Sequence, residues 1–101
     1  MVNFDLKSYT ALYLKNAQEE IRLIRDYINQ KDVDIKALHR ITHTLKGQSF
    51  FMGIDDIGNK AWELEKYYKS LLEGNGNPSN KRLDVEVILN EIEKLLANKK
   101  I

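Results

Sequence analysis

A chain of 101 residues, 43% hydrophobic and 31% charged, has the composition of one globular domain and is too short to build two separate cores. Its 16 Lys and Arg nearly balance 15 Asp and Glu, so the net charge of +1 creates no overall field that attracts nucleic acid or a membrane surface. It has no cysteine, which excludes disulfides and thiol chemistry, and no apolar run of about 18 residues that could cross a membrane. We therefore expect a cytoplasmic protein that recognises any charged partner locally.

The positions of proline and glycine leave room for long helices. Proline occurs only at position 78, the glycines lie at 47, 53, 58, 74 and 76, and no stretch sustains the alternation of a strand. The first predicted helix covers residues from about 5 to 30, because its apolar residues recur at the three-and-four spacing of one helical face. These residues are Tyr13, Ala17, Ile21, Ile24 and Ile28.

Asp34 is suited to cap a second helix, predicted from about residue 34 to 52. Gly53 can close that helix, and Asp55 or Asp56 can begin a third helix that covers residues from about 55 to 73. The apolar stripe of the second helix comprises Leu38, Ile41, Leu45 and Met52, and that of the third comprises Ile57, Ala61, Leu64, Tyr68 and Leu71.

Turn-forming residues between 73 and 81 separate the third helix from a fourth, predicted from about residue 81 to 98. Ser79 or Asn80 is available as its N-cap. The residues expected to face the core are Leu83, Val87 or Ile88, Ile92 and Leu95. Four amphipathic helices with short connections favour an all-α antiparallel bundle, formed by residues 1–101 as a single domain.

The helical wheel places His43 on the solvent face of the second helix. At about 100° per residue, the apolar stripe of this helix centres roughly 190° from His43, so a buried core histidine is disfavoured. His39, Lys46, Gly47 and Phe50 fall within about 60° of His43. Lys46 is either an ordinary surface lysine or a positive charge beside an anion bonded to the imidazole.

Gly47 and the phenylalanines that follow it point to a site that accommodates a large reactant or partner. Glycine within a helix costs roughly 1 kcal/mol relative to alanine, so Gly47 serves either close helix packing or clearance beside His43. Phe50 and Phe51 form either an exposed docking patch or apolar cover for the loop and the first helix.

A hairpin that turns near Ile54 brings Glu65 of the third helix level with His43. Glu65 lies about 80° from the centre of its own apolar stripe, at the boundary between core and solvent. Its carboxylate can accept a hydrogen bond from one imidazole nitrogen and leave the other nitrogen free as a nucleophile. The alternative is a solvated glutamate that pairs with Lys66 or Lys69.

Residues 43–53, HTLKGQSFFMG, resemble the H-x-x-K-G-x-[SA]-x-x-x-G signature of histidine phosphotransfer (HPt) domains. The matching residues are His43, Lys46, Gly47, Ser49 and Gly53, followed by Ile57, Leu64 and Glu65 at the family's downstream positions. The resemblance implies an up-and-down four-helix bundle that carries a phosphoryl group on an exposed histidine. It implies a carrier without its own ATP site rather than an enzyme.

The resemblance also assigns roles to individual residues. It makes His43 the phosphoacceptor through Nε2, and Lys46 the residue that stabilises the phosphoryl oxygens. Glu65 corresponds to the acidic residue that binds Nδ1 in the related chemotaxis kinases. The docking surface for partners is expected to comprise Gly47, Phe50, Phe51 and His39.

The partners implied are a histidine kinase and the aspartate of a response-regulator receiver domain. Phosphoryl transfer depends on positioning and charge stabilisation and usually on a metal. The sequence has no carboxylate cluster suited to Mg²⁺ and no glycine-rich nucleotide loop. We therefore expect the receiver domain to supply Mg²⁺, the kinase to supply ATP, and this chain to act as a monomeric carrier with no metal site of its own.

The chain is either a free-standing carrier or the N-terminal domain of a chemotaxis-type or hybrid kinase. In the chemotaxis subfamily another histidine joins the network near the position of Trp62, which tryptophan cannot do. Gln48 is also larger than the small residue often found at its position.

Two further hypotheses do not involve phosphoryl transfer. His39 and His43, one helical turn apart, could bind a metal with Glu65 as a third ligand. Alternatively, the bundle could be an adaptor without chemistry that binds a partner through Phe50 and Phe51.

Overall fold

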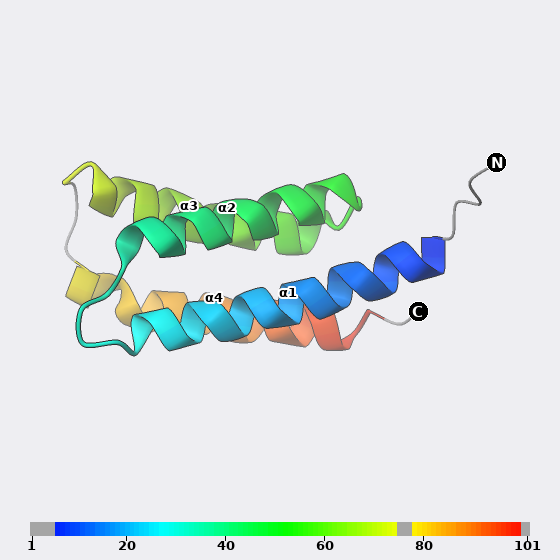
Figure 1. Cartoon of the computed structure of the whole chain (residues 1–101), viewed down its shortest axis with the longest axis horizontal. Helices are drawn as coiled ribbons and strands as arrows, with labels where there is room; N and C mark the ends of the chain where they lie inside the picture. The colour runs from blue at the N-terminus through cyan, green and yellow to red at the C-terminus, as the bar shows by residue number, and fades with distance from the viewer. Residues whose placement is uncertain (1–5, 75–77, 100–101) are drawn as a thin grey trace.

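The computed structural model describes residues 6–74 and 78–99, which form four α-helices and no strand (Figure 1). These helices are α1 (Leu6–Ile28), α2 (Ile35–Phe51), α3 (Asp55–Leu72) and α4 (Pro78–Ala97). The all-α prediction is confirmed. In Figure 1 the chain reverses direction between consecutive helices, and the molecule is elongated, with principal extents of 49 × 25 × 22 Å.

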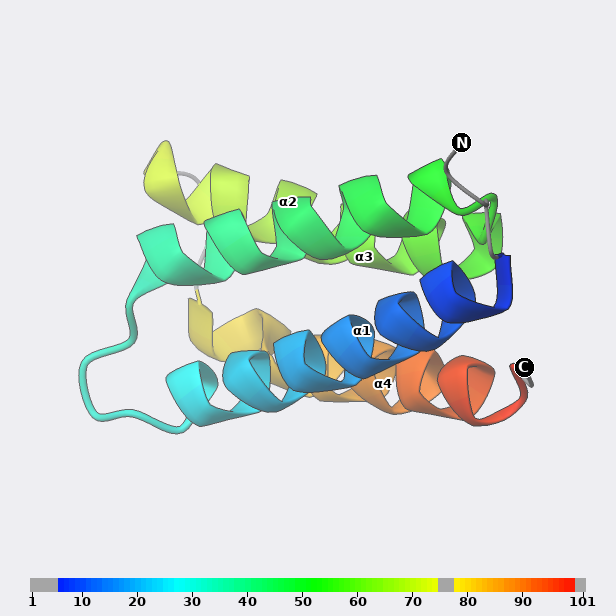
Figure 2. The same cartoon turned by 45° about the vertical axis from the view of Figure 1, so that its right-hand side comes forward.

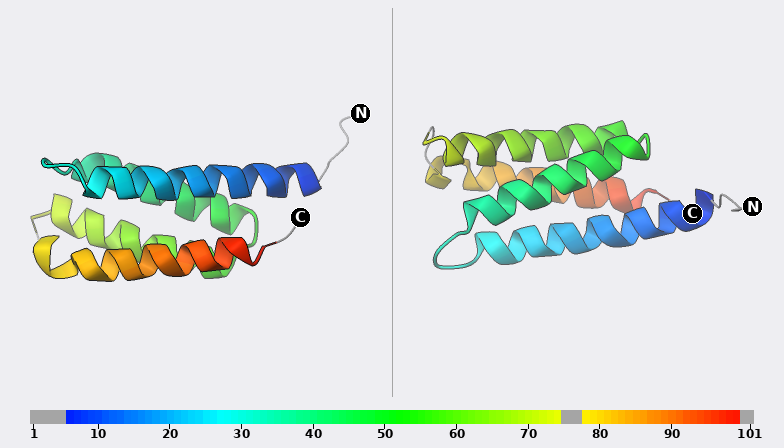
Figure 3. Two further views of the ribbon diagram at one scale, coloured as in Figure 1. Left: turned by 90° about the horizontal axis from the view of Figure 1, so that it is seen from below. Right: turned by 45° about the horizontal axis from the view of Figure 1, so that its top comes forward.

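The helices are arranged as two pairs. Figures 1 and 2 show α2 and α3 together above α1 and α4, and the view from below in Figure 3 shows α1 and α4 side by side in front of the other pair. The α2–α3 pair has the most extensive contact and the α1–α4 pair has the least. The functional site described below therefore lies on the most closely packed half of the bundle.

Local signals fix both ends of α2. The Asp34 side chain accepts a hydrogen bond of 3.0 Å from the Ala37 backbone N–H, as expected of an N-cap. Gly53 has a φ of +73°, its N–H donates to the Phe50 carbonyl at 3.0 Å, and the Ile54 N–H donates to the Ser49 carbonyl at 2.8 Å. Both capping predictions are confirmed. This tight turn sets the register of α3 against α2.

The core consists of side chains from all four helices. The predicted stripe of α1 is buried in full, and so are the first four residues of the predicted stripe of α3, while Leu71 is only partly buried. In the predicted α2 stripe Leu38 and Leu45 are buried, whereas Ile41 and Met52 are partly buried. The buried face of α2 also includes Thr42 and Ser49, which sequence hydrophobicity did not reveal. Their hydroxyls donate to the carbonyls of Leu38 at 2.9 Å and Leu45 at 2.8 Å, so burial leaves neither unsatisfied.

The predictions for α4 were partly wrong. The helix begins at Pro78, so Ser79 and Asn80 lie within it and do not cap it; proline suits a first helical turn because its fixed φ is helical and its missing N–H is not needed there. The core-facing residues are Val85, Leu89, Ile92 and Leu96, whereas Val87 is 55% exposed and Ile88 and Leu95 are partly buried. The side chain of Leu83 lies outside the described residues.

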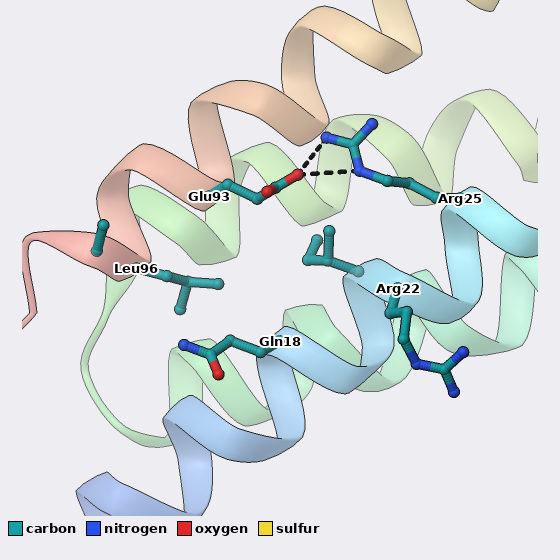
Figure 4. A pocket seen from close by; sticks show the side chains of 7 residues that line it. Gln18, Arg22, Arg25, Glu93 and Leu96 are labelled. Atoms are coloured by element: carbon teal, nitrogen blue, oxygen red, sulfur yellow. Dashed lines mark hydrogen bonds and ion pairs between the residues drawn. The ribbon is translucent and has the colours of Figure 1, made fainter.

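Polar contacts join α1 to α4 around a surface groove. Arg25 donates to Glu86 at 2.6 Å and to Asn90 at 2.9 Å, and it also pairs with Glu93 (Figure 4). The groove below this cluster has a volume of about 380 Å³ and is lined by Gln18, Ile21, Arg22, Arg25, Glu93, Leu96 and Ala97. It lies on the α1–α4 half of the bundle, away from the helix that carries His43.

Candidate functional site

His43 lies near the middle of α2, on the side opposite its buried stripe. Its side chain is 65% exposed, as the helical wheel predicts. The buried residues Leu38, Thr42, Leu45 and Ser49 repeat at intervals of four, three and four, which leaves position 43 pointing outward. A buried structural histidine is therefore excluded.

Glu65 of α3 binds the imidazole. The distance from His43 Nδ1 to Glu65 Oε2 is 2.8 Å, which confirms the predicted alignment of these two residues across the hairpin. Glu65 is more buried than expected for a boundary residue, with only 8% of its surface exposed. Because a carboxylate accepts hydrogen bonds, Nδ1 carries the proton, and Nε2 of the neutral ring presents its lone pair away from Glu65.

Lys46 uses the other oxygen of the same carboxylate. The distance from Lys46 Nζ to Glu65 Oε1 is 2.8 Å, and the lysine side chain is 22% exposed. Burial is the largest influence on the pKa of Glu65 and opposes ionisation, but the hydrogen bonds from Lys46 and His43 outweigh it and hold the pKa below its ordinary value. Glu65 is thus an ionised carboxylate that holds a histidine and a lysine in place.

The alternative pairing of Glu65 with Lys66 or Lys69 is not formed. The ammonium group of Lys66 instead lies over the ring of Trp62, 4.3 Å from its centroid, in a cation–π contact. The indole is 46% exposed. Trp62 therefore interacts with its own helix and adds no hydrogen bond to the histidine network.

Gly47 faces open space. A Cβ built on this residue would have no non-local heavy atom within 4 Å, so close helix packing does not explain the glycine. The explanation based on packing applies to Gly58 instead, where a Cβ would lie 2.7 Å from Cε1 of Phe50. Phe50 is 39% exposed and packs on α3, whereas Phe51 is 86% exposed. Phe51, rather than Phe50, is the prominent apolar side chain at this end of α2.

An apolar groove connects α1 to the surface beside Gly47. Its volume is about 320 Å³ and its lining consists of Tyr9, Leu12, Tyr13, Asn16, Gly47, Gln48, Phe51 and Met52. Tyr9 and Leu12 are 46% and 53% exposed, and sequence reasoning did not identify them. The sequence could have indicated both residues, because they are large apolar residues outside the buried stripe of α1. Below them, the Tyr13 hydroxyl and Ser49 Oγ lie 2.7 Å apart and join α1 to α2.

His39 lies one turn before His43 on the same helix. The two imidazole centroids are 6.4 Å apart and the ring planes differ by 19°. Glu65 is committed to His43 and Lys46, and the described residues contain no group of three or more His, Cys, Asp or Glu side chains that could hold a metal ion. The geometry gives no support to a metal site formed by His39, His43 and Glu65.

A helical bundle with one exposed imidazole, oriented by a buried carboxylate on the adjacent helix, defines a protein suited to carry a group on histidine. The sequence model of the Hpt domain matches residues 8–98, and the chain belongs to this family. Hpt domains perform histidine phosphotransfer in phosphorelays and interact with histidine kinases and response regulators. The searches of curated proteins and of solved structures gave no match. Among the described residues, no helix is long and apolar enough to span a membrane.

Proposed function

We propose that His43 accepts a phosphoryl group on Nε2 and exchanges it with the aspartate of a receiver domain. The observation that carries this proposal is the 2.8 Å hydrogen bond between Nδ1 and Glu65 on a ring that is 65% exposed. One nitrogen is held by the protein, and the other is open to a partner. The remaining features of the site support the same reaction.

In the proposed transfer, the Nε2 lone pair attacks the phosphorus atom of an aspartyl phosphate. The N–P bond forms as the bond between phosphorus and the aspartate oxygen breaks, and the aspartate leaves as a carboxylate. No proton needs to move, because Nδ1 keeps its hydrogen throughout. The imidazole gains positive charge as the bond forms, and the ionised Glu65 stabilises that charge through its hydrogen bond.

Lys46 has two roles in this proposal. Its ammonium group fixes Glu65 before transfer, at 2.8 Å, and it stands one helical turn from His43 on the same side of α2. An ammonium has three donor hydrogens, so it can keep the carboxylate and also contact a phosphoryl oxygen. The receiver domain supplies Mg²⁺ for the transfer, and a separate histidine kinase supplies the phosphoryl group from ATP.

The docking surface in this proposal surrounds Gly47. The groove between α1 and α2 supplies Tyr9, Leu12 and Phe51, which are all large and exposed. Gly47 keeps the space beside the imidazole open, so that a receiver domain can bring its aspartate to Nε2. Phe50 and His39 complete this surface along α2. A monomeric, antiparallel up-and-down bundle leaves all of it accessible.

The proposed carrier is a single domain over residues 1–101, either free-standing or part of a chemotaxis-type or hybrid kinase. Trp62 disfavours the chemotaxis-type alternative, because its indole contacts Lys66 and contributes no second imidazole to the site. To distinguish the alternatives, residues 1–101 are expressed with and without any flanking segments of the natural gene product. Phosphoryl transfer from each protein to one receiver domain is then measured.

Phosphotransfer from a phosphorylated receiver domain in the presence of Mg²⁺ tests the central proposal. We expect an adduct that is labile in acid and stable in alkali, located on His43 by mass spectrometry. His43→Gln should abolish it, while Thr44→Ala, which alters the adjacent exposed residue, should retain it. A phosphoryl group that persists in the His43→Gln variant would place the acceptor elsewhere and refute the assignment.

A further inference from the structure

His39 is a second imidazole on the exposed side of α2 to which the proposed transfer assigns no chemical role. It lies one turn before His43, with ring centroids 6.4 Å apart and planes within 19° of each other. Among the residues whose side chains the structure describes, 7–74 and 84–99, neither ring nitrogen of His39 has a hydrogen-bond partner. A donor without a partner next to a phosphoacceptor is a candidate for binding the incoming group.

The geometry of His43 determines where that group lies. Because Nδ1 is held by Glu65 of α3, the phosphoryl group is attached to Nε2, away from that carboxylate. Side chains on a helix lean toward its N-terminus, so the His43 ring lies over the turn that contains His39. One tetrahedral phosphoryl group and one hydrogen bond of about 2.8 Å fit within the separation of the two rings.

Two lysines near the site, Lys46 and Lys66, already have contacts. Lys46 binds Glu65 at 2.8 Å, and Lys66 lies over Trp62. Lys46 can contact a phosphoryl oxygen through a second N–H while it keeps Glu65, whereas Lys66 can turn toward the phosphoryl group only by leaving the Trp62 ring. His39 gives up no contact, because its ring nitrogens have no partner in the described part of the chain. His39 can therefore add a hydrogen bond to the phosphoryl group from α2 itself without breaking an existing one.

We propose that His39 is a positioning residue that donates a hydrogen bond to a phosphoryl oxygen on His43, most strongly when its imidazole is protonated. This inference rests on the proposed phosphorylation of His43 and adds a residue that the family signature does not specify. The phosphoryl group is then held between His39 on its N-terminal side and Lys46 on its C-terminal side. Its retention depends on pH through His39.

The charges around His39 favour such a switch. The charges on α2 and α3 near His39 are mostly positive, and a phosphoryl group on His43 adds negative charge among them. The Tyr13–Ser49 contact fixes how α1 lies along α2, and it brings residues 22–26 of α1 to about the same position along the bundle axis as His39. In that part of α1, Arg22 pairs with Glu19 and Asp26, and Arg25 pairs with Glu86 of α4. The charged and titratable groups of α2 and α3 near His39 are Lys36, Arg40, His43, Glu65, Lys66 and Lys69.

Chemical phosphorylation with phosphoramidate tests the inference without any protein partner. The titration of the His39 ring is followed by ¹H–¹⁵N NMR, and that of the phosphoryl group by ³¹P NMR. A phosphoryl group carries nearly two negative charges, so the His39 midpoint should rise by about 0.5–1 pH unit when His43 is phosphorylated. Besides the inflection from protonation of the phosphoryl group itself, the ³¹P signal should show a second inflection at the pH of the His39 midpoint.

Two variants separate His39 from the general positive charge of the surface. His39→Gln keeps a polar side chain but cannot titrate, and it should remove the second ³¹P inflection while the inflection of the phosphoryl group itself remains. Lys36→Gln removes a cation one turn further from His43 and should leave the second inflection in place. By reciprocity, a midpoint shift of this size corresponds to about a 3- to 10-fold change in retention of the phosphoryl group between acidic and alkaline pH.

The outcomes distinguish this inference from the function on which it rests. If phosphoramidate labels His43 but the His39 midpoint does not move, His39 does not bind the phosphoryl group and the carrier function stands. If His43 is not labelled at all, both proposals are wrong. If the second ³¹P inflection survives in His39→Gln, it belongs to another group and the inference is refuted.

Discussion

Truncation of Glu65 should impair phosphoryl transfer more than it impairs folding. The Glu65→Ala variant removes the acceptor of the 2.8 Å bond from Nδ1, just where the ring gains positive charge. A hydrogen bond to a charged group contributes about 1.5–3 kcal/mol. If most of this energy is expressed in the transition state, transfer to or from a receiver domain should slow by about 10- to 100-fold.

The cost to stability should be smaller. Glu65 is buried and ionised, so its removal also relieves the desolvation of a charge, which offsets much of the lost ion pair with Lys46. Lys46 is 22% exposed and can turn its ammonium group into water. We expect a loss of about 1 kcal/mol or less, which corresponds to a decrease of at most roughly 4–8 °C in Tm.

The assay compares single-turnover transfer rates and thermal unfolding of the wild type, Glu65→Ala and Glu65→Gln. Glu63→Ala, which removes an exposed carboxylate two residues away on α3, is the matched control and should behave as the wild type. Transfer at the wild-type rate in Glu65→Ala would refute the orienting role. A loss of rate fully explained by unfolded protein would refute it as well.

The pH dependence of stability gives an independent check on the charge of Glu65. Its folded-state pKa lies below the ordinary value of 4.5, so the stabilisation from its ionised form is complete above that pH and is lost as the pH falls through the folded-state pKa. The difference in unfolding free energy between wild type and Glu65→Gln should therefore be constant from neutral pH down to about 5 and shrink in stronger acid.

Three further predictions concern other parts of the molecule. Gly47→Ala should stabilise the protein by about 1 kcal/mol in urea unfolding, whereas Gly58→Ala should give no stabilisation because its Cβ displaces Phe50. A larger side chain at position 47 should slow phosphoryl transfer, and faster transfer would contradict the clearance role of Gly47. Burial raises the pKa of Glu20 to about 7, so the unfolding free energy should fall as the pH rises from 5 to 8. Glu20→Gln should remove this pH dependence and add roughly 1 kcal/mol at pH 8, after allowance for partial exposure. An unchanged pH dependence in this variant would exclude Glu20 as its source. Leu12→Asp should raise the receiver concentration needed for half-maximal transfer by about 10-fold without altering Tm, and unchanged concentration dependence would remove the groove from the docking surface.

Local sequence signals determined the half of the bundle that carries the site. The apolar period of α2 fixes which side of that helix faces the core, and hence that His43 faces water. Asp34 and Gly53 act within a few residues of their own positions, so the ends of α2 and the short turn to α3 follow from sequence. Once that turn is fixed, helical geometry alone brings Glu65 level with His43.

The sequence did not determine which face of α4 enters the core. Apolar residues occupy enough positions between 83 and 96 to define two overlapping stripes, and periodicity cannot choose between them. Packing against the other helices selects Val85 and Leu89 and leaves Val87 exposed. The burial of Thr42 and Ser49 was also hidden, because their hydroxyls are satisfied only by carbonyls of the folded helix.

The finer structure of the site depends on contacts between residues far apart in the chain. The choice of Lys46 over Lys66 as the partner of Glu65, the packing of Phe50 on Gly58, and the groove that joins Leu12 to Phe51 all require two helices at a definite distance and rotation. The spacing of apolar residues in a sequence specifies which face of each helix is directed toward the core. It leaves the pairing of side chains across helices to the packing of the complete bundle, because that pairing depends on the positions of both backbones at once.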